Sequence, residues 1–340
     1  MTDTALSDAV PHATTAGLVS IDDIRAAARR IAGVAVRTPL MPSPWPGLWL
    51  KPEMLQPIGA FKIRGAMNAI ARLDPAVRAR GVLAHSSGNH AQAVAYAARA
   101  FGIEAHIVIP DNAPARKIEA TRALGATVEL VPLEQRFSRP EELARQTGKA
   151  MVPPFDHPDV IAGQGTIGLE IADDIDSGAA GFDEPPAAIL VPVSGGGLIA
   201  GVAAAAAALL PGTAVIGVEP ELAGDAAESF RAGERRAWSP ADTARTVADG
   251  LRTFSVGELP WRHISAQVSE IITVTESEIL QATRMLAEQA RLVAEPSGAV
   301  PVAAHLFHSD ALPAGRRVAV VSGGNIDPVL LGRLLTGGEA

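Results

Sequence analysis

The stretch "AAILVPVSGGGLIAGVAAAAAALL", residues 187–210, contains the pattern that decides the fold. An apolar run is followed by Ser194, by the three glycines Gly195, Gly196 and Gly197, and then by an alanine-rich run typical of a helix. Glycines let the backbone approach an anion closely, and the N-terminus of the next helix offers unpaired N–H groups. The stretch therefore predicts a strand, a phosphate-binding loop and a helix. A tight strand-to-helix turn without a ligand is the alternative.

Short apolar runs alternate with helical patterns along much of the chain. From residue 82, "VLAHSS" leads to "NHAQAVAYAARAFG", "EAHIVIP" to "PARKIEATRALG" and "TVELVP" to "RPEELARQTG". A second series runs from "VIAGQGTIGLEIADDI" to "RRVAVVSGGNIDPVLLGRLL". Such units build parallel sheets covered by helices, and a single core rarely grows beyond roughly 300 residues. We therefore predict an α/β protein of two domains, each with a mainly parallel sheet flanked by helices.

Two segments outside these series also carry a prediction. Ser20 followed by Asp23 is typical of a helix N-cap with an acidic first turn. Residues 233–269 have little regular pattern, and the stretch "WSPADTARTVADGLRTFSVGELPW", residues 238–261, is predicted to form a loop. Long loops in α/β domains often carry function.

The composition favours a small-molecule enzyme. A net charge of -8 and a pI near 5.5 argue against a nucleic-acid or anionic-membrane partner, because both need a basic surface. The chain has no cysteine, which excludes disulfides and thiolate chemistry and permits a reducing compartment. Its start resembles no signal peptide, and its longest apolar run is shorter than the roughly 20 residues of a membrane span. We expect a cytoplasmic protein.

A lysine stands among apolar residues in "PIGAFKIRGAMNAI", Pro57 to Ile70. A cation near a helix start opposes the helix dipole, and burial beside Phe61 would favour the neutral amine of Lys62. Taken alone, a solvated lysine is the simpler reading. Together with a phosphate loop that lacks a nucleotide motif, Lys62 indicates pyridoxal phosphate, which needs a lysine for its aldehyde and a cradle for its phosphate.

A dehydrogenase is the rival interpretation of the glycine loop. Glu219 ends the next apolar run, about 20 residues on, where dinucleotide-binding folds keep their ribose-binding acid. The glycine spacing is G-G-G-x-x-x-G, however, and not G-x-G-x-x-G, and no Gly-Lys-Ser/Thr follows that would make a P-loop.

Five motifs in order carry a resemblance to a known family: "AFKIRGAMNAI", "SSGNHAQAVAYAA", "IAGQGTIGLEI", "PVSGGGLIAG" and "VVSGGN". The chain resembles, from about Ile21 to Leu335, the fold-type II (tryptophan-synthase-β-like) pyridoxal-phosphate enzymes of the threonine/serine dehydratase and serine racemase branch. The resemblance implies a large cofactor domain of residues 1–80 and 156–340, a small substrate-side domain of residues 81–155, and a homodimer or homotetramer. The tail after Leu335 is short and leaves no room for the regulatory domain of biosynthetic threonine deaminases, so we expect a catabolic enzyme.

The resemblance also implies roles for individual residues. Lys62 matches the Schiff-base lysine, which also moves the proton at the substrate α-carbon, and Phe61 would pack against the cofactor ring. Asn89 would reach the ring hydroxyl, and Ser322 would be the neutral partner of the pyridine nitrogen. The residues that would bind the substrate carboxylate at a helix N-terminus are Ser86, Ser87, Gly88, Asn89 and His90, and those of the phosphate loop are Ser194, Gly195, Gly196, Gly197 and Leu198. An ordinary Ser-Gly cap is the alternative for "SSGNH".

The segment "GVEPELAGDA" matches the cation site of this branch. The implied ligands are Glu219, the carbonyl of Ala223 and Asp225. Such hard oxygen ligands suit Mg²⁺ or Ca²⁺. Two solvated acids in a loop are the alternative, and a cation role for Glu219 removes the argument for a dehydrogenase.

The implied reaction is the conversion of a β-hydroxy amino acid to a 2-oxo acid and ammonia. Racemisation is the alternative, because the racemases of the family use a serine at the place of Ser87 to protonate the opposite face and the dehydratases share it. Phe155 stands where serine racemases tend to carry an asparagine, which favours the dehydratase. A non-catalytic cofactor-binding protein is a third reading, which the intact site residues disfavour.

Two arginines bear on the choice of substrate. Arg139 matches an arginine of the racemase subgroup, and Arg252, next to Thr253, lies in a loop that the family places over the substrate. Either guanidinium could bind a second carboxylate, which would suit 3-hydroxyaspartate. Surface arginines without a ligand are the alternative, and threonine and serine remain the default substrates.

Overall fold

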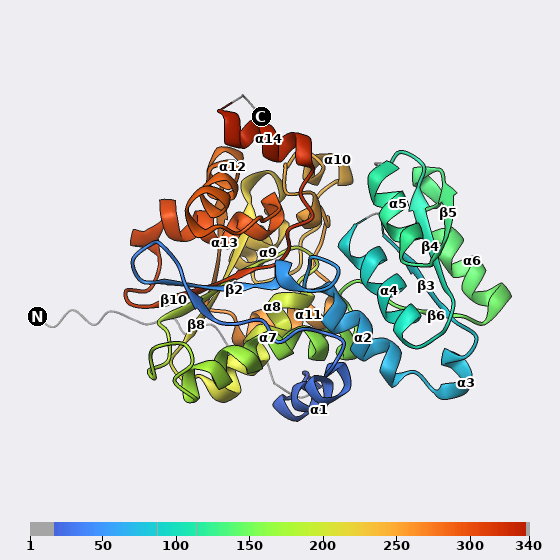
Figure 1. Ribbon diagram of the computed structural model, residues 1–340, viewed down its shortest axis with the longest axis horizontal. Helices are drawn as coiled ribbons and strands as arrows, with labels where there is room; N and C mark the ends of the chain where they lie inside the picture. Colours follow the sequence, from blue (N-terminus) through green and yellow to red (C-terminus); the bar gives the residue numbers. More distant parts are fainter. Residues whose placement is uncertain (1–16, 87, 114, 338–340) are drawn as a thin grey trace, which may run out of the picture.

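Two separate β-sheets organise the chain (Figure 1). The computed structural model describes residues 17–86, 88–113 and 115–337. Helices cover both sheets, and the smaller sheet forms its own lobe, at the right of Figure 1. The predicted α/β class with two sheet-containing parts is confirmed. The boundaries at residues 80/81 and 155/156 stay a prediction.

The larger sheet has six strands in the order β1-β2-β10-β7-β8-β9. All neighbouring pairs are parallel except β1 and β2, which are antiparallel. The strands are β1 (Met41–Pro42), β2 (Leu48–Pro52), β7 (Ala188–Pro192), β8 (Ala214–Pro220), β9 (Glu270–Val274) and β10 (Arg317–Val321). The sequence analysis did not identify β1 and β2, because their short "MP" and "LWLKP" segments show no alternation before a helical pattern.

The smaller sheet has four parallel strands in the order β5-β4-β3-β6. They are β3 (Val82–His85), β4 (Ala105–Pro110), β5 (Thr127–Val131) and β6 (Ala150–Met151). The three predicted β-then-α units are present, because α4 (Asn89–Ala100), α5 (Ala115–Ala123) and α6 (Ser138–Thr147) follow β3, β4 and β5.

Most of the remaining helical segments belong to the larger-sheet part or join the two parts, whereas η2 lies between β5 and α6. The α-helices are α1 (Ile21–Ile31), α2 (Lys62–Arg72), α3 (Pro75–Arg78), α7 (Pro158–Asp176), α8 (Gly197–Leu209), α9 (Asp225–Ala232), α10 (Pro240–Thr243), α11 (Glu258–Gln267), α12 (Glu276–Met285), α13 (Pro296–Phe307) and α14 (Pro328–Thr336). The 3-10 turns are η1 (Glu53–Leu55), η2 (Leu133–Gln135), η3 (Glu221–Ala223), η4 (Asp249–Leu251) and η6 (Ser309–Ala311), and η5 (Leu286–Ala290) is a π-helical turn. None of the helices within the described residues is long and apolar enough to cross a membrane.

The loop predicted for residues 238–261 is partly wrong, because α10 lies inside it and α11 begins inside it at Glu258. The two carboxylate oxygens of Asp156 accept hydrogen bonds from the backbone N–H groups of Glu258 (2.9 Å) and Leu259 (3.0 Å). These two donors belong to the first turn, whose N–H groups have no partner within the helix. The cap comes from a residue about 100 positions earlier in the chain, so no local pattern could reveal it. The N-cap predicted at Ser20 is confirmed as a capping box with Asp23.

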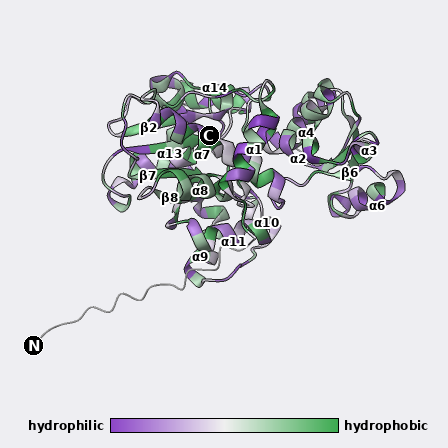
Figure 2. Cartoon of the chain, turned by 90° about the horizontal axis from the view of Figure 1, so that it is seen from below, coloured by the Kyte–Doolittle hydropathy of each residue, from purple (hydrophilic) through white to green (hydrophobic). Residues whose placement is uncertain are grey.

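Glycines allow α2, α7 and α8 to pack unusually closely. A Cβ atom on Gly201 of α8 would lie 2.4 Å from the backbone nitrogen of Gly165 on α7. On the other side of α7, a Cβ on Gly163 would lie 2.6 Å from the carbonyl oxygen of Arg64 on α2. Both distances are shorter than real Cβ contacts, so larger residues would push the helices apart. In Figure 2 the hydrophobic residues are concentrated along α8, whose Gly197–Ala206 part is fully buried.

A buried charged cluster connects α2 to the larger sheet and to α7. Arg64 donates to both oxygens of Glu53 (2.7 and 2.8 Å) and of Glu170 (2.6 and 2.9 Å), and Lys51 donates to Glu170 (2.7 Å). The side chains of Arg64, Glu53 and Lys51 are completely inaccessible. Two cations and two anions balance formally. The carboxylates hold the pKa of Arg64 above its ordinary value although burial alone would lower it.

We predict that Arg64→Met lowers the free energy of unfolding by about 3–5 kcal/mol, because it leaves the buried Glu53 carboxylate without a counter-charge. The matched control is Arg72→Met on the same helix, whose salt bridge to Asp159 is half exposed and should contribute less than about 1 kcal/mol. Urea denaturation of both variants measures the difference. Equal losses in the two variants would contradict a special role for the buried cluster.

Candidate active site

Lys62 lies at the first turn of α2, in the chain segment that connects the two sheets. The backbone N–H of Phe61 donates to the carbonyl oxygen of Ser322 (3.0 Å), and Ala60 forms an antiparallel bridge with Gly323. The start of the lysine helix is thus tied to the end of β10. The amine of Lys62 donates to the carbonyl oxygen of Pro154 (2.7 Å) and lies 5.1 Å from the centre of the Phe61 ring.

Burial lowers the pKa of the Lys62 amine to about 8. No carboxylate acts on this amine to restore its charge, since burial is the only resolved cause of the shift among the described residues. At pH 7 about a tenth of such an amine is neutral, far more than at the ordinary lysine pKa of about 10.4. A neutral amine can attack a carbonyl carbon or accept a proton, and the protonated form can do neither.

The glycine loop predicted from the sequence precedes α8. Gly196 has φ of +85°, which L-residues other than glycine rarely adopt, and a Cβ atom on Gly195 would lie 2.3 Å from the ring of Phe155. These two glycines are thus required by the local conformation and by packing. No hydrogen bond recorded for the described residues uses the N–H of Gly195 or Gly196 as a donor. Together with the N-terminus of the 13-residue α8, these N–H groups could bind an anion.

The hydroxyl of Ser194 links the glycine loop to the loop before α11. It accepts a hydrogen bond from the backbone N–H of Thr253 (3.3 Å), which leaves its own proton free to donate to an anion. Leu198 is buried in the first turn of α8. The structure thus places Thr253, expected at the substrate, beside the expected phosphate loop.

The predicted carboxylate loop lies at the end of β3 and the start of α4. The backbone N–H of Gly88 donates to the hydroxyl of Ser86 (3.2 Å), and Gly88 caps α4 without a side-chain hydrogen bond. Ser87 lies outside the described residues. His90 is buried and its Nε2 lies 2.9 Å from the carbonyl oxygen of Val152, so this nitrogen carries the proton. Burial and the nearby Lys62 lower the pKa of His90 to about 3, so the ring is neutral.

Asn89 is held by two residues that the sequence analysis did not predict as site residues. Its Nδ2 donates to the carboxylate of Glu295 (2.6 Å), and its Oδ1 accepts from the Nδ2 of Asn325 (2.8 Å). Glu295 precedes the first residue of α13, and Asn325 follows β10. A sequence signal existed for Glu295, because it is an isolated acid in the apolar stretch "LVAEPSGAV".

The pKa of Glu295 is raised to about 7 by burial and by the nearby charge of Asp249. The hydrogen bond from Asn89, the charge of Lys117 and the backbone of Asn325 oppose this rise. Ser322, expected to face a ring nitrogen, is buried at the end of β10, next to Gly323, which forms the bridge with Ala60. The residues expected around the cofactor therefore come from α2, the loop before α8, the start of α4 and the end of β10.

The carboxylates of Glu219 and Asp225 are buried, and neither forms a salt bridge within the part of the chain that the structure describes. Oε2 of Glu219 accepts from the backbone N–H of Ala227 (2.8 Å), but its Oε1 and both oxygens of Asp225 have no hydrogen-bond partner among the described residues. Burial raises the pKa of both groups, and the charge of Asp225 raises that of Glu219 further. Ala223 is buried at the end of η3, between the two acids in the chain. Orphaned buried oxygens of this kind fit a bound cation.

The two arginines expected at the substrate have different surroundings. Arg139 on α6 donates to Glu129 (2.6 Å) and to Glu142 (2.7 Å), so its guanidinium already has two carboxylate partners. Arg252 is exposed and donates only to the carbonyl oxygen of Thr246 (3.1 and 2.6 Å) among the described residues. The geometry therefore leaves Arg252 the freer of the two to bind a further carboxylate.

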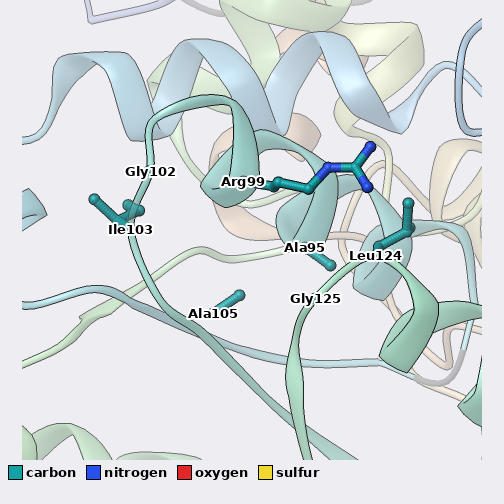
Figure 3. Close-up of a pocket in the computed structure, with 7 residues that line it drawn as sticks. All are labelled: Ala95, Arg99, Gly102, Ile103, Ala105, Leu124 and Gly125. Atoms are coloured by element: carbon teal, nitrogen blue, oxygen red, sulfur yellow. The ribbon is translucent and has the colours of Figure 1, made fainter.

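A pocket of about 180 Å³ lies apart from these residues, between α4 and the turns before β4 and β5 (Figure 3). Its lining includes Arg99 and Leu124 and none of the predicted site residues. We assign no role to it.

The available groups fit pyridoxal phosphate. Lys62 offers a partly neutral amine for an aldehyde, and the loop before α8 offers free N–H groups for a phosphate.

Comparison with known proteins agrees with this assignment. Residues 31–324 match the family described as "Pyridoxal-phosphate dependent enzyme". The chain is 38% identical over 326 residues to the L-threo-3-hydroxyaspartate ammonia-lyase of Saccharomyces cerevisiae, covering 93% of this chain and 96% of that protein. It is 42% identical to the L-threonine ammonia-lyase of Thermotoga maritima, covering 94% and 79%. The structure of maize serine racemase aligns with a TM-score of 0.85 at 38% identity, covering 94% and 97%.

The lowered pKa of Lys62 can be tested in the cofactor-free protein. We predict that labelling of Lys62 by an amine-reactive reagent reaches half its maximal rate at about pH 8. In the urea-unfolded chain the same lysine should titrate near the ordinary value of about 10.4. Mass spectrometry of the Lys62 peptide measures both titrations. The same midpoint in the folded and unfolded chains would contradict the neutral-amine interpretation.

Proposed function

The chain belongs to the pyridoxal-phosphate-dependent enzymes, and from this premise we propose that it is a dehydratase (ammonia-lyase) of β-hydroxy amino acids. The single observation that carries the proposal is the partly neutral amine of Lys62. This amine donates to Pro154, which follows β6 of the smaller sheet, and its helix is tied to the end of β10 of the larger sheet. The names of the ammonia-lyase relatives support the reaction type.

The proposed cofactor contacts follow from the groups around Lys62. The N–H groups of the loop from Ser194 to Leu198, together with the Ser194 hydroxyl, would hold the phosphate. Phe61 would contact the ring, and Asn89 and Ser322 would serve its hydroxyl and its nitrogen. When bound, pyridoxal phosphate supplies a conjugated ring that delocalises the negative charge left at the substrate α-carbon.

The chain's own residues bind the substrate and move the proton. The N–H groups at the start of α4 bind the substrate carboxylate, with Ser86, Ser87, Gly88, Asn89 and His90 forming this loop. The neutral amine of Lys62 accepts the α-proton, and the protonated amine can return a proton to the departing β-hydroxyl, which leaves as water. The resulting enamine tautomerises, and its hydrolysis by one water yields the 2-oxo acid and ammonia, so the reaction is balanced.

We propose 3-hydroxyaspartate as a substrate beside threonine and serine. The exposed guanidinium of Arg252 is not engaged by a carboxylate among the described residues and lies next to Thr253, which contacts the glycine loop. A second substrate carboxylate would complete a bidentate pair with it. The substrate named in the yeast relative supports this choice. Arg139, already paired with Glu129 and Glu142, is the weaker candidate.

Racemisation is the second candidate activity. The likeness to maize serine racemase supports it, and a proton donor on the face opposite Lys62 is all that it requires. Ser87 is the residue proposed for that role. The ring of Phe155, packed against Gly195, stands where serine racemases tend to carry an asparagine and favours dehydration.

We also propose that Glu219, Asp225 and the carbonyl of Ala223 bind Mg²⁺ or Ca²⁺. Within the described residues, no group of three His, Asp or Glu side chains could hold a metal ion, so this site needs its backbone carbonyl. Three unpartnered carboxylate oxygens in a buried location support a cation there. We further propose that the protein forms a homodimer or homotetramer, that it is cytoplasmic and that it has a catabolic role. The domain boundaries are proposed at residues 80/81 and 155/156.

Release of 2-oxo acid by the holoenzyme tests the activity. We predict turnover of at least one of four substrates: serine, threonine, threo-3-hydroxyaspartate and erythro-3-hydroxyaspartate. Lys62→Ala should lose both this turnover and the visible absorbance of the bound cofactor. Arg252→Ala should raise KM for 3-hydroxyaspartate about 10-fold or more, the effect of losing one charged hydrogen bond, and leave threonine nearly unchanged.

Arg139→Ala serves as the matched control and should not discriminate between these substrates. Chiral analysis of the remaining substrate separates elimination from racemisation. A protein that binds the cofactor through Lys62 yet releases no 2-oxo acid from any of the four substrates would refute the dehydratase.

The cation proposal predicts that Mg²⁺ or Ca²⁺ stabilises the protein. At a concentration 100 times Kd, the ion should add about 2.7 kcal/mol to the free energy of unfolding and raise Tm by several degrees. The gain should shrink as the pH falls below neutral, because the carboxylates with raised pKa become protonated and cannot bind the ion.

Asp225→Asn should abolish this gain, whereas Glu221→Gln, which removes an exposed acid of η3, should keep it. Thermal melts with the added ion and with a chelator measure the effect. An Asp225→Asn variant that responds to the ion like the unchanged protein would rule out this site.

A further inference from the structure

Glu295 is a buried carboxyl group for which the proposed reaction has no task. It is 4% exposed at the N-cap of α13, and a Cβ atom on Gly323 would lie 2.4 Å from its Oε1. Its backbone N–H donates to the carbonyl oxygen of Gly323 (3.0 Å). Glu295 therefore packs against the residue that follows Ser322 and that bridges to the start of α2.

The hydrogen bonds around Asn89 allow only one orientation of its amide. The Nδ2 of Asn325 donates to the carbonyl oxygen of Ile58 (2.9 Å) and to the Oδ1 of Asn89 (2.8 Å), so both of its protons are used. An ionised Glu295 can only accept a hydrogen bond. If the Asn89 amide turned over, its NH₂ group would face the NH₂ group of Asn325 and its oxygen would face the carboxylate. Both contacts would be repulsive.

This arrangement leaves one N–H of the Asn89 amide without a partner among the described residues. The other N–H points to Glu295 and the oxygen accepts from Asn325. A side chain that always presents a donor suits an electron-rich oxygen, such as the ring hydroxyl of the proposed cofactor. A freely rotating amide would present its oxygen part of the time and repel that group.

Charged groups from two other elements, η4 and α5, lie near this arrangement. Asp249 of η4 acts on Glu295 and raises its pKa, and Lys117 of α5, which forms an ion pair with Asp249, acts in the opposite direction. Arg116, next to Lys117, donates to the carbonyl oxygen of Ile326 (3.0 Å), so α5 lies against the segment that contains Asn325. The carboxyl of Glu295 thus ionises close to neutral pH.

We propose that Glu295 is a positioning residue: its carboxylate, with Asn325, holds the Asn89 amide so that an N–H faces the ring oxygen of the bound cofactor. This inference rests on the proposed function and extends it to a residue outside the predicted site. The Asn89–Glu295 hydrogen bond also joins the start of α4, which follows β3 of the smaller sheet, to the start of α13, which packs on the larger sheet.

The test uses binding of pyridoxal phosphate to the cofactor-free protein, measured by visible absorbance. Glu295→Met should raise the Kd at least about 10-fold, because the Asn89 amide loses its charged acceptor. In the Asn89→Ala background, the same substitution should have almost no further effect, because Glu295 acts through Asn89. Glu276→Met, which removes a partly buried acid that accepts from Val247, is the matched control and should leave Kd unchanged.

Glu295→Gln gives a second readout that does not depend on a loss of folding. Its amide oxygen can still accept from Asn89, so Kd should stay within a few-fold of the unchanged protein. The glutamine cannot ionise, so a transition of the absorbance spectrum near pH 7 should disappear. Kd values and spectra, unlike turnover, do not require the proposed dehydration to occur.

Three results would overturn the proposal. An equal increase in Kd from Glu295→Met with and without Asn89 would show that Glu295 acts independently of that residue. An unchanged Kd and spectrum in both Glu295 variants would show that it has no role. An unchanged transition near pH 7 in Glu295→Gln would assign the ionisation to another group. Normal cofactor binding without release of a 2-oxo acid would refute the dehydratase alone.

Discussion

The buried ion pairs of Arg64 with Glu53 and Glu170 position the helix that begins with Lys62. The guanidinium connects η1 after β2, the lysine helix α2 and helix α7 through bidentate contacts to Glu53 and Glu170. A charge buried in this way is tolerated only with complete pairing, so the three segments can pack in one arrangement. Lys62 lies two residues before Arg64, and the second anchor, from Phe61 to Ser322, fixes the helix start against β10. The position of the reactive amine follows from these two constraints.

The protein handles its buried acids in three different ways, and each way indicates a different role. Glu53 and Glu170 face cations and stabilise the fold. Glu295 accepts a hydrogen bond from the amide of Asn89, and its pKa is raised to about 7, so it is partly ionised near neutral pH. Glu219 and Asp225 have oxygens without partners, which is costly unless an ion binds. Lys62 is a base for which burial, with no carboxylate acting on the amine among the described residues, lowers the pKa. The neutral form of this amine is the reactive group of the site.

Much of the fold and part of the site could be predicted because the signals are local. The β-then-α units after residue 82, the cap at Ser20, and the strand, glycines and helix from residue 187 each follow from neighbouring residues. α11 escaped prediction because Asp156 caps it from a distant segment. Glu295 and Asn325 escaped because their function depends on Asn89, more than 200 positions away in the chain. No periodicity or motif records a hydrogen bond between such distant residues.

From the amino-acid order alone, most helices and strands, the glycine loop and the family could be predicted. These features depend on backbone conformation, hydrophobic pattern and motif order. The tertiary structure alone decided the state of the side chains. Burial without a counter-charge makes Lys62 partly neutral, and pairing with Glu129 and Glu142 occupies Arg139 while Arg252 bonds only a carbonyl among the described residues. Desolvation and charge pairing depend on what surrounds a residue in space. That surrounding comes from segments far apart in the chain, so the amino-acid order does not display it.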